Sequence, residues 1–165
     1  MQINEKFEKA FSTLKDKRED DYMMPVTEDR IRGAEVELDV VFPDSYKVFL
    51  REIGSSYWPN YFIGLNPLPV PATDVISITF RQRQVDGLPL PHYLIPIEDD
   101  GYGNYYCLDS SKMKDSECPV VFWNHDLSLD QTPEWIAASY IDWLYDQVNE
   151  ALAIDAEYEK ERNNS

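Results

Sequence analysis

The chain has 165 residues, of which 43% are hydrophobic and 13% aromatic. This length fits a single domain that can bury a core, and the composition is too apolar and aromatic for a disordered protein. Asp and Glu number 31 against 15 Lys and Arg, which gives a formal net charge of −16. This charge argues against nucleic acid and anionic membranes as partners and favours basic ones, although an acidic surface also serves solubility alone.

The sequence predicts one cytoplasmic domain over residues 1–165, with its core at about 27–152. No stretch approaches the roughly 20 apolar residues of a membrane span, and the N-terminus lacks the apolar region of a secretory signal. Cys107 and Cys118 have no metal-ligand spacing around them, so we expect two buried free thiols. The charged residues 155–165 predict a tail that frays.

Three helices are predicted before residue 55, because apolar residues recur there at helical spacing. Thr27 is a good N-cap for the second helix, Pro43 suits the first position of the third, and Gly54 ends it. The predicted faces are Ile3, Phe7, Ala10, Phe11 and Leu14, then Ile31, Ala34, Glu35 and Leu38, then Tyr46, Phe49, Leu50 and Ile53.

Residues 55–65 predict a strand or a broken hairpin that carries Tyr57, Trp58, Tyr61 and Phe62. Successive side chains of a strand point to opposite faces, so four large rings in six residues cannot all be buried on one side. Exposed Tyr and Trp beside acidic residues are typical of a protein-binding hot spot.

The next segment contains Pro67, Pro69 and Pro71, which predict a stiff loop and exclude a central strand. Residues 74–84 are ambiguous. Their apolar residues almost alternate, as in a strand, whereas Thr73 is a suitable helix cap and the polar end at 81–84 suits a helix end in water.

Three segments, 93–97, 105–109 and 119–123, predict an antiparallel meander. Gly101 and Gly103 in the first connection tolerate the positive φ that a tight turn demands, and the second connection, 110–117, is a longer polar loop. Thr132 followed by Pro133 predicts the start of the last helix. Its buried face is expected to contain Ile136, Tyr140, Trp143, Leu144, Val148 and Leu152, with Trp135 at the edge.

No motif predicts catalysis or a cofactor. The two histidines, His92 and His125, lack zinc spacing, and no glycine-rich phosphate loop opens a helix. The acidic turn 98–100 and Asp126 together offer oxygen ligands to a divalent cation, but without the spacing of a calcium loop. His125 beside Asp126 resembles a base with an orienting carboxylate, yet a role in the turn is favoured because adjacent side chains diverge.

Three motifs in this order resemble the SUKH superfamily, known for a yeast regulator of cell-wall glucan synthesis and for bacterial immunity proteins. They are FPDSYKVFL at 42–50 with Gly54, IPI at 95–97 followed by DGYGNYYCLD at 100–109, and PVVFWNHD at 119–126. Residues 107–121 are especially similar to YobK-type immunity proteins, which favours a bacterial source. Phe42 and Ser55 depart from the residues usual in the family and affect only turn shape.

The resemblance implies an α+β fold with a central, mainly antiparallel sheet flanked by N-terminal and C-terminal helices, and it favours a helix at 74–84. It also implies an immunity protein that neutralises a cognate toxin, commonly a nuclease, by direct binding. The residues predicted to contact that partner are Tyr57, Trp58, Asp99, Asp100, Tyr102, Asn104 and Asp126. Two alternatives stay open: a regulatory scaffold without a toxin, and a metal-dependent enzyme using Asp99, Asp100, His125 and Asp126.

Overall fold

A computed structural model of the protein describes residues 2–17, 24–66 and 73–165. Over these ranges it shows helices and one antiparallel sheet in the strand order β1-β2-β3-β4, which confirms the predicted α+β fold. The elements in chain order are α1 (Ile3–Lys17), α2 (Glu28–Leu38), α3 (Asp44–Glu52), α4 (Val75–Arg83), β1 (Leu94–Asp99), β2 (Tyr105–Asp109), a 3-10 turn (Ser110–Lys112), β3 (Val120–Trp123), β4 (Glu134–Ala137) and α5 (Tyr140–Asn163).

The second and third helices form where the sequence predicts them. The Thr27 hydroxyl accepts a hydrogen bond from the backbone N–H of Arg30 at 3.3 Å, so the predicted N-cap of α2 is confirmed. Helix α3 begins one residue later than predicted, because Pro43 is its N-cap. The cap that Pro43 cannot provide comes from Glu117, whose carboxylate accepts from the Ser45 N–H at 2.8 Å.

The ambiguous segment 74–84 is a helix, as the family resemblance favours. Its N-cap is Asp74 and not Thr73, because the Asp74 carboxylate accepts from the backbone N–H of Ser77 at 3.0 Å. The three prolines of the predicted stiff loop lie outside the described residues.

The predicted meander is confirmed in β1, β2 and β3. Strand β1 continues to Asp99, two residues beyond the predicted end, with a register shift between Pro96 and Glu98. The tight turn that follows places Gly101 at φ 81° and Gly103 at φ 92°, a left-handed conformation that glycine adopts without steric cost.

Strand β4 replaces the predicted start of the last helix. Residues 134–137 pair with β3, and Trp135 lies opposite Val121 with its side chain 62% exposed. Pro133 is tolerated here because it only precedes an edge strand. The helix prediction failed at this point because the free edge of β3, which is absent from the local sequence pattern, supplies hydrogen bonds to this segment. The true N-cap of α5 is Ser139.

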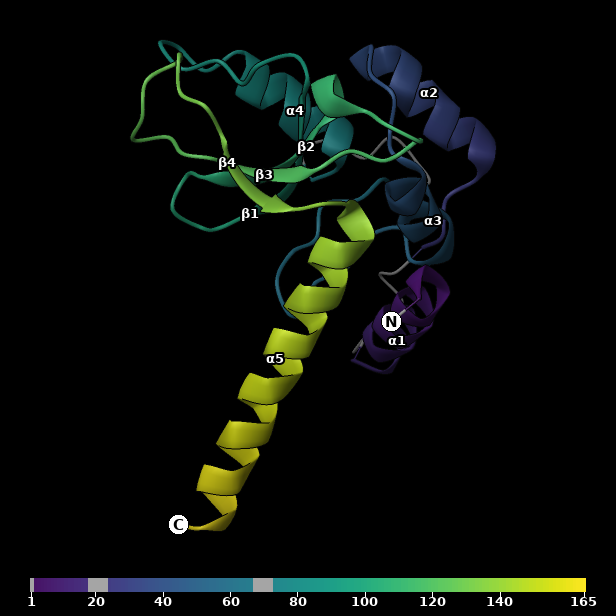
Figure 1. The fold of residues 1–165 in the computed structure, drawn as a ribbon, viewed down its shortest axis with the longest axis vertical. Helices are drawn as coiled ribbons and strands as arrows, with labels where there is room; N and C mark the ends of the chain where they lie inside the picture. Colours follow the sequence, from purple (N-terminus) through teal and green to yellow (C-terminus); the bar gives the residue numbers. More distant parts are fainter. Residues whose placement is uncertain (1, 18–23, 67–72) are drawn as a thin grey trace.

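Helix α5 continues through the charged segment at 155–163, which was predicted to be a fraying tail. The helix extends to Asn163, and its second half projects beyond the rest of the described chain (Figure 1). Residues of high helix propensity dominate the segment, and Lys160 and Arg162 complement the negative end of the helix dipole. Helix α1 packs beside α5, where Lys17 pairs with Asp155 at 2.8 Å.

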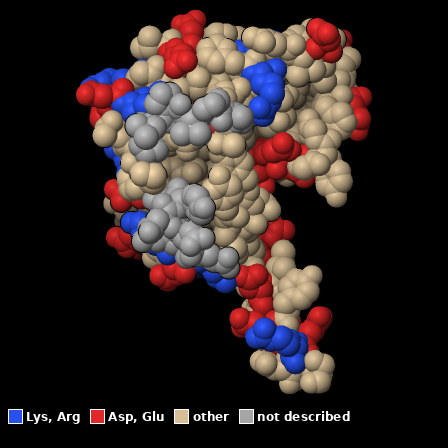
Figure 2. All heavy atoms as spheres, turned by 180° about the vertical axis from the view of Figure 1, so that it is seen from behind, with Lys and Arg blue, Asp and Glu red and all other residues tan. Residues whose placement is uncertain are grey.

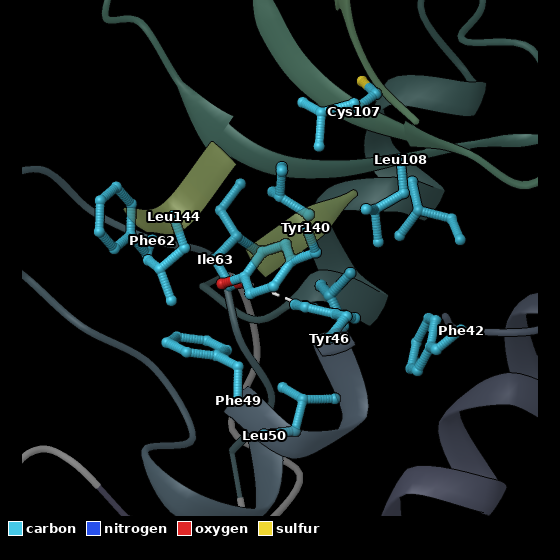
Figure 3. Close-up of a cluster of buried hydrophobic side chains, with 14 of the residues drawn as sticks. Phe42, Tyr46, Phe49, Leu50, Phe62, Ile63, Cys107, Leu108, Tyr140 and Leu144 are labelled. Atoms are coloured by element: carbon cyan, nitrogen blue, oxygen red, sulfur yellow. Dashed lines mark hydrogen bonds between the residues drawn. The ribbon is translucent and has the colours of Figure 1, made fainter. Parts of the chain in front are cut away.

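An aromatic cluster joins the helices to the sheet (Figure 3). The ring of Tyr46 on α3 packs edge-on against that of Tyr140 on α5, with ring centroids 4.9 Å apart. The buried Tyr46 hydroxyl donates to the backbone carbonyl of Ile63 at 2.9 Å. Cys107 and Cys118 are buried free thiols, as predicted.

Because α5 begins after Ser139 and not after Thr132, removing the two side chains should lower stability by different amounts. The Ser139 hydroxyl accepts from the N–H of Asp142 at 3.2 Å, so Ser139→Ala should lower the free energy of unfolding by about 1 kcal/mol in urea denaturation. Thr132→Ala is the matched control, and it should change stability by less than about 0.5 kcal/mol. A larger loss for Thr132→Ala than for Ser139→Ala would contradict the assignment.

Candidate protein-binding surface

The β1–β2 turn is built by its own acidic side chains. The Asp99 carboxylate accepts from the N–H of Gly101 at 2.7 Å. The Asp100 carboxylate accepts from the N–H of Tyr102 at 2.8 Å and from the Asn104 side-chain amide at 2.7 Å. Partial burial alone would raise the pKa of Asp100, but these hydrogen bonds outweigh it and lower the pKa. The oxygens of Asp100 therefore hold the turn together.

The same network ties the turn to the end of β3. The side-chain oxygen of Asn104 accepts from the backbone N–H of His125 at 2.9 Å and lies 2.7 Å from the ring Nδ1. The other ring nitrogen of His125 lies 3.1 Å from the Asp126 carboxylate. Three predicted contact residues, Asp100, Asn104 and Asp126, are thus linked through His125, which supports the structural role favoured for that residue.

The tip of this turn presents an aromatic side chain to solvent. Tyr102 is 81% exposed, and the two glycines beside it leave its ring uncovered. Among the described residues, no group of three His, Cys, Asp or Glu side chains is arranged to hold a metal ion. The turn and the adjoining loop after β3 therefore offer a partner one large ring, Tyr102, and the exposed carboxylate of Asp126.

The aromatic loop after α3 is a broken hairpin, one of the two alternatives that the sequence predicts. Its ends are joined by a single bridge between Ser56 and Phe62, and Phe62 also bridges Glu98 at the end of β1. The rings divide as expected: Phe62 is fully buried, whereas Tyr57 is 61% exposed and stacks on Tyr61 with centroids 4.8 Å apart. The described contacts do not join Tyr57 to the β1–β2 turn.

Trp58 lies at a hollow of about 380 Å³ between this loop and α5. The ammonium group of Lys17 lies over the Trp58 ring, 5.2 Å from the ring centroid, and also pairs with the carboxylate of Asp155. The hollow is lined by Trp58, Pro59 and Asn60 on one side and by Glu150, Ala151 and Ile154 of α5 on the other.

A row of four side chains crosses one face of the sheet beside this hollow. The register pairs Tyr106 with Glu98 on one side and with Phe122 on the other. Phe122 pairs in turn with Glu134, so the four lie on the same face. The rings of Tyr106 and Phe122 are half-buried, with centroids 5.0 Å apart.

Acidic side chains from the sheet and from α5 surround Tyr106. Burial raises the pKa of its phenol, and the negative charges of Glu98, Asp100, Glu134 and Glu150 raise it further. In the space-filling view, Asp and Glu atoms gather in the recess between the body and the projecting helix (Figure 2). This acidic and aromatic recess was not predicted, because β4 was assigned to a helix.

Glu98 is the buried acid of this row, whereas the sequence assigned it to the acidic turn 98–100. Its side chain is only 3% exposed, and one carboxylate oxygen accepts from the Asn60 amide at 2.8 Å. The other oxygen has no hydrogen-bond partner among the described residues. Burial raises the pKa of Glu98 to about 7. The hydrogen bond from Asn60 lowers this pKa, whereas the negative charges of Asp100 and Asp99 raise it.

The fold and this surface together define an all-antiparallel α+β domain with an acidic, ring-bearing exterior. The sequence model of the SUKH_5 family, described as SMI1-KNR4 cell-wall, matches residues 5–149, and the chain belongs to that family. A crystal structure of a protein from Pseudomonas syringae pv. tomato is similar in fold. It has 22% sequence identity and a TM-score of 0.64, and the match covers 86% of this chain and 98% of that one. No helix within the described ranges is long and apolar enough to cross a membrane.

The buried carboxylate predicts a pH-dependent stability. Because the folded-state pKa of Glu98 lies above the unfolded value, the folded state binds more protons than the unfolded one between pH 4.5 and about 7, and stability falls as pH rises through that window. Glu98→Gln removes this loss, so the variant should gain about 2 kcal/mol relative to wild type between about pH 5 and pH 8 in urea denaturation.

The matched control is Glu134→Gln, which changes an exposed carboxylate in the same row of the sheet. Its stability should follow the wild-type pH dependence. If the difference in stability between Glu98→Gln and wild type stays constant with pH, Glu98 does not ionise in this window.

Proposed function

We propose that this protein is an immunity protein, which neutralises a cognate bacterial toxin with a basic surface, such as a nuclease, by binding it directly. The observation that carries the proposal is the combination of a net charge of −16 with exposed rings at Tyr102, Tyr57 and Trp135. Membership of the SMI1-KNR4 family supports it. A toxin that grips nucleic acid needs a basic surface, and an acidic surface of this kind can occupy it.

The proposal includes no catalytic step. The oxygens of Asp100 hold the turn, and the His125 ring faces Asn104 and Asp126, so neither is directed at a substrate. Burial raises the pKa of the Cys107 thiol and raises that of Cys118 to about 12. Raised pKa values keep both thiols protonated, which argues against a thiolate nucleophile.

A second candidate function in the same class is a regulatory binding protein without a toxin partner. The family description, which refers to the cell wall, is the observation that favours it. Such a protein would use the same surface, but the neighbouring gene would encode no toxin domain.

Co-expression tests the proposal directly. The C-terminal domain of the toxin encoded beside this gene is expressed in a bacterial host with and without this protein. We expect the toxin alone to prevent growth and the pair to restore it, together with a stable complex on gel filtration. Full lethality in the presence of well-folded protein would overturn the proposal.

If acidic side chains attract the toxin, reversing their charge should change the association rate. Asp126→Lys combined with Asp130→Lys, both exposed residues of the loop after β3, should slow association with the toxin roughly tenfold at low salt and leave the dissociation rate nearly unchanged. The control is Glu8→Lys with Glu37→Lys on α1 and α2, which alters net charge equally. Stopped-flow rates that fall equally for both variants would show that only net charge matters and not the position of the acids.

A further inference from the structure

We propose that the recess formed by α5 and the aromatic loop, beside the sheet face that carries Tyr106, binds a basic amphipathic segment of a partner protein. An apolar side chain of that segment packs between Trp58 and Ile154, and a lysine or arginine beside it pairs with Glu150. The inference rests on the proposed function and deepens it, because it names the part of the surface where the partner docks and the chemistry that the partner presents.

The apolar part of the site is a stripe on the projecting half of α5. Ala151, Ile154 and Tyr158 are spaced by three and four residues and therefore share one side of the helix. Ile154 is 47% exposed and Tyr158 is 69% exposed. Ala151 and Ile154 form one wall of the hollow, and Trp58 forms part of the opposite wall. A side chain from a partner that enters here is covered on two sides.

The molecule itself shows what kind of charge this hollow accepts. Lys17 places its ammonium over the Trp58 ring and within 2.8 Å of the Asp155 carboxylate. A cation at one end of the hollow is thus held by one ring and one acid. Glu150 lines the same hollow, and no described lysine or arginine pairs with it.

The acidic residues that form no ion pair determine the charge of the segment that the recess can bind. Glu150 and Glu134 form no ion pair with another described residue, and both lie close enough to Tyr106 to raise its pKa. Burying them against an apolar or acidic partner would leave carboxylates without compensation, which is costly. A second copy of the chain would bring the same acids and a net charge of −16 to the interface, so a basic partner is the occupant that fits.

A titration of the full chain with a defined probe tests this site. The 15N-labelled protein is titrated with a short amphipathic peptide of leucine and lysine while backbone and indole resonances are followed by NMR. The largest shifts are expected at Trp58, Tyr106 and the turns of α5 around Ile154. A serine and lysine peptide of equal charge should bind roughly tenfold more weakly, because it has no apolar side chain to bury.

Two substitutions in the recess separate the contribution of charge to peptide binding from the contribution of apolar contact. Glu150→Gln should weaken the leucine and lysine peptide about threefold, as expected for one exposed ion pair, and Ile154→Ser should weaken it at least fivefold. Glu37→Gln on α2 is the matched control and should leave affinity unchanged. Thermal unfolding of each variant checks that the fold is retained.

Three outcomes would overturn the inference. Shifts spread evenly over the acidic surface, or equal losses for Glu150→Gln and Glu37→Gln, would mean that only net charge attracts the peptide. Shifts at Ile154 that grow with protein concentration in the absence of peptide would identify the occupant as a second copy. Since the peptide experiment needs no toxin, its failure leaves the co-expression result standing, and a failed co-expression leaves the peptide result standing.

Discussion

The structure depends on the buried hydroxyl of Tyr46 and the aromatic rings around it. This hydroxyl donates to the carbonyl of Ile63, so a helix residue fixes the backbone of a loop that has little regular structure of its own. A buried carbonyl without a partner costs more than the hydrogen bond itself gains, so the loop is held firmly in one position. Because Tyr46 also packs against Tyr140, the same cluster fixes the start of α5.

These contacts give α5 two roles along its length. Its first half belongs to the core, with Trp143 packed against Phe62 of the aromatic loop at 5.1 Å between ring centroids. Its second half projects away from the body (Figure 1). Residues of this half and of the aromatic loop line the hollow. Because α5 is helical throughout this half, Ile154 and Glu150 are already placed opposite Trp58, and such preorganisation reduces the entropy that a partner must overcome on binding.

The acidic residues of this protein divide into those that build the fold and those that remain for a partner. Asp100 and Asp74 accept backbone hydrogen bonds at a turn and at a helix start, and their carboxylates are occupied there. Glu98 is buried at a cost to stability and holds Asn60 beside the recess. Glu134 and Glu150 carry their charges at the surface. Net charge alone therefore overstates the negative surface that a basic partner meets.

The sequence by itself determined the features that depend on neighbouring residues. Helical spacing and the Thr27 cap located α2, two glycines located the β1–β2 turn, and the ordered motifs indicated the family, because caps, turns and periodicity act over a few residues. Only the tertiary structure decided the rest of the site. Residues 134–137 follow a Thr-Pro pair that suits a helix start, yet they form β4 because the free edge of β3 lies beside them. The burial of Glu98 and the meeting of Trp58 with Ile154 likewise arise from contacts between segments far apart in the chain, which no local pattern records.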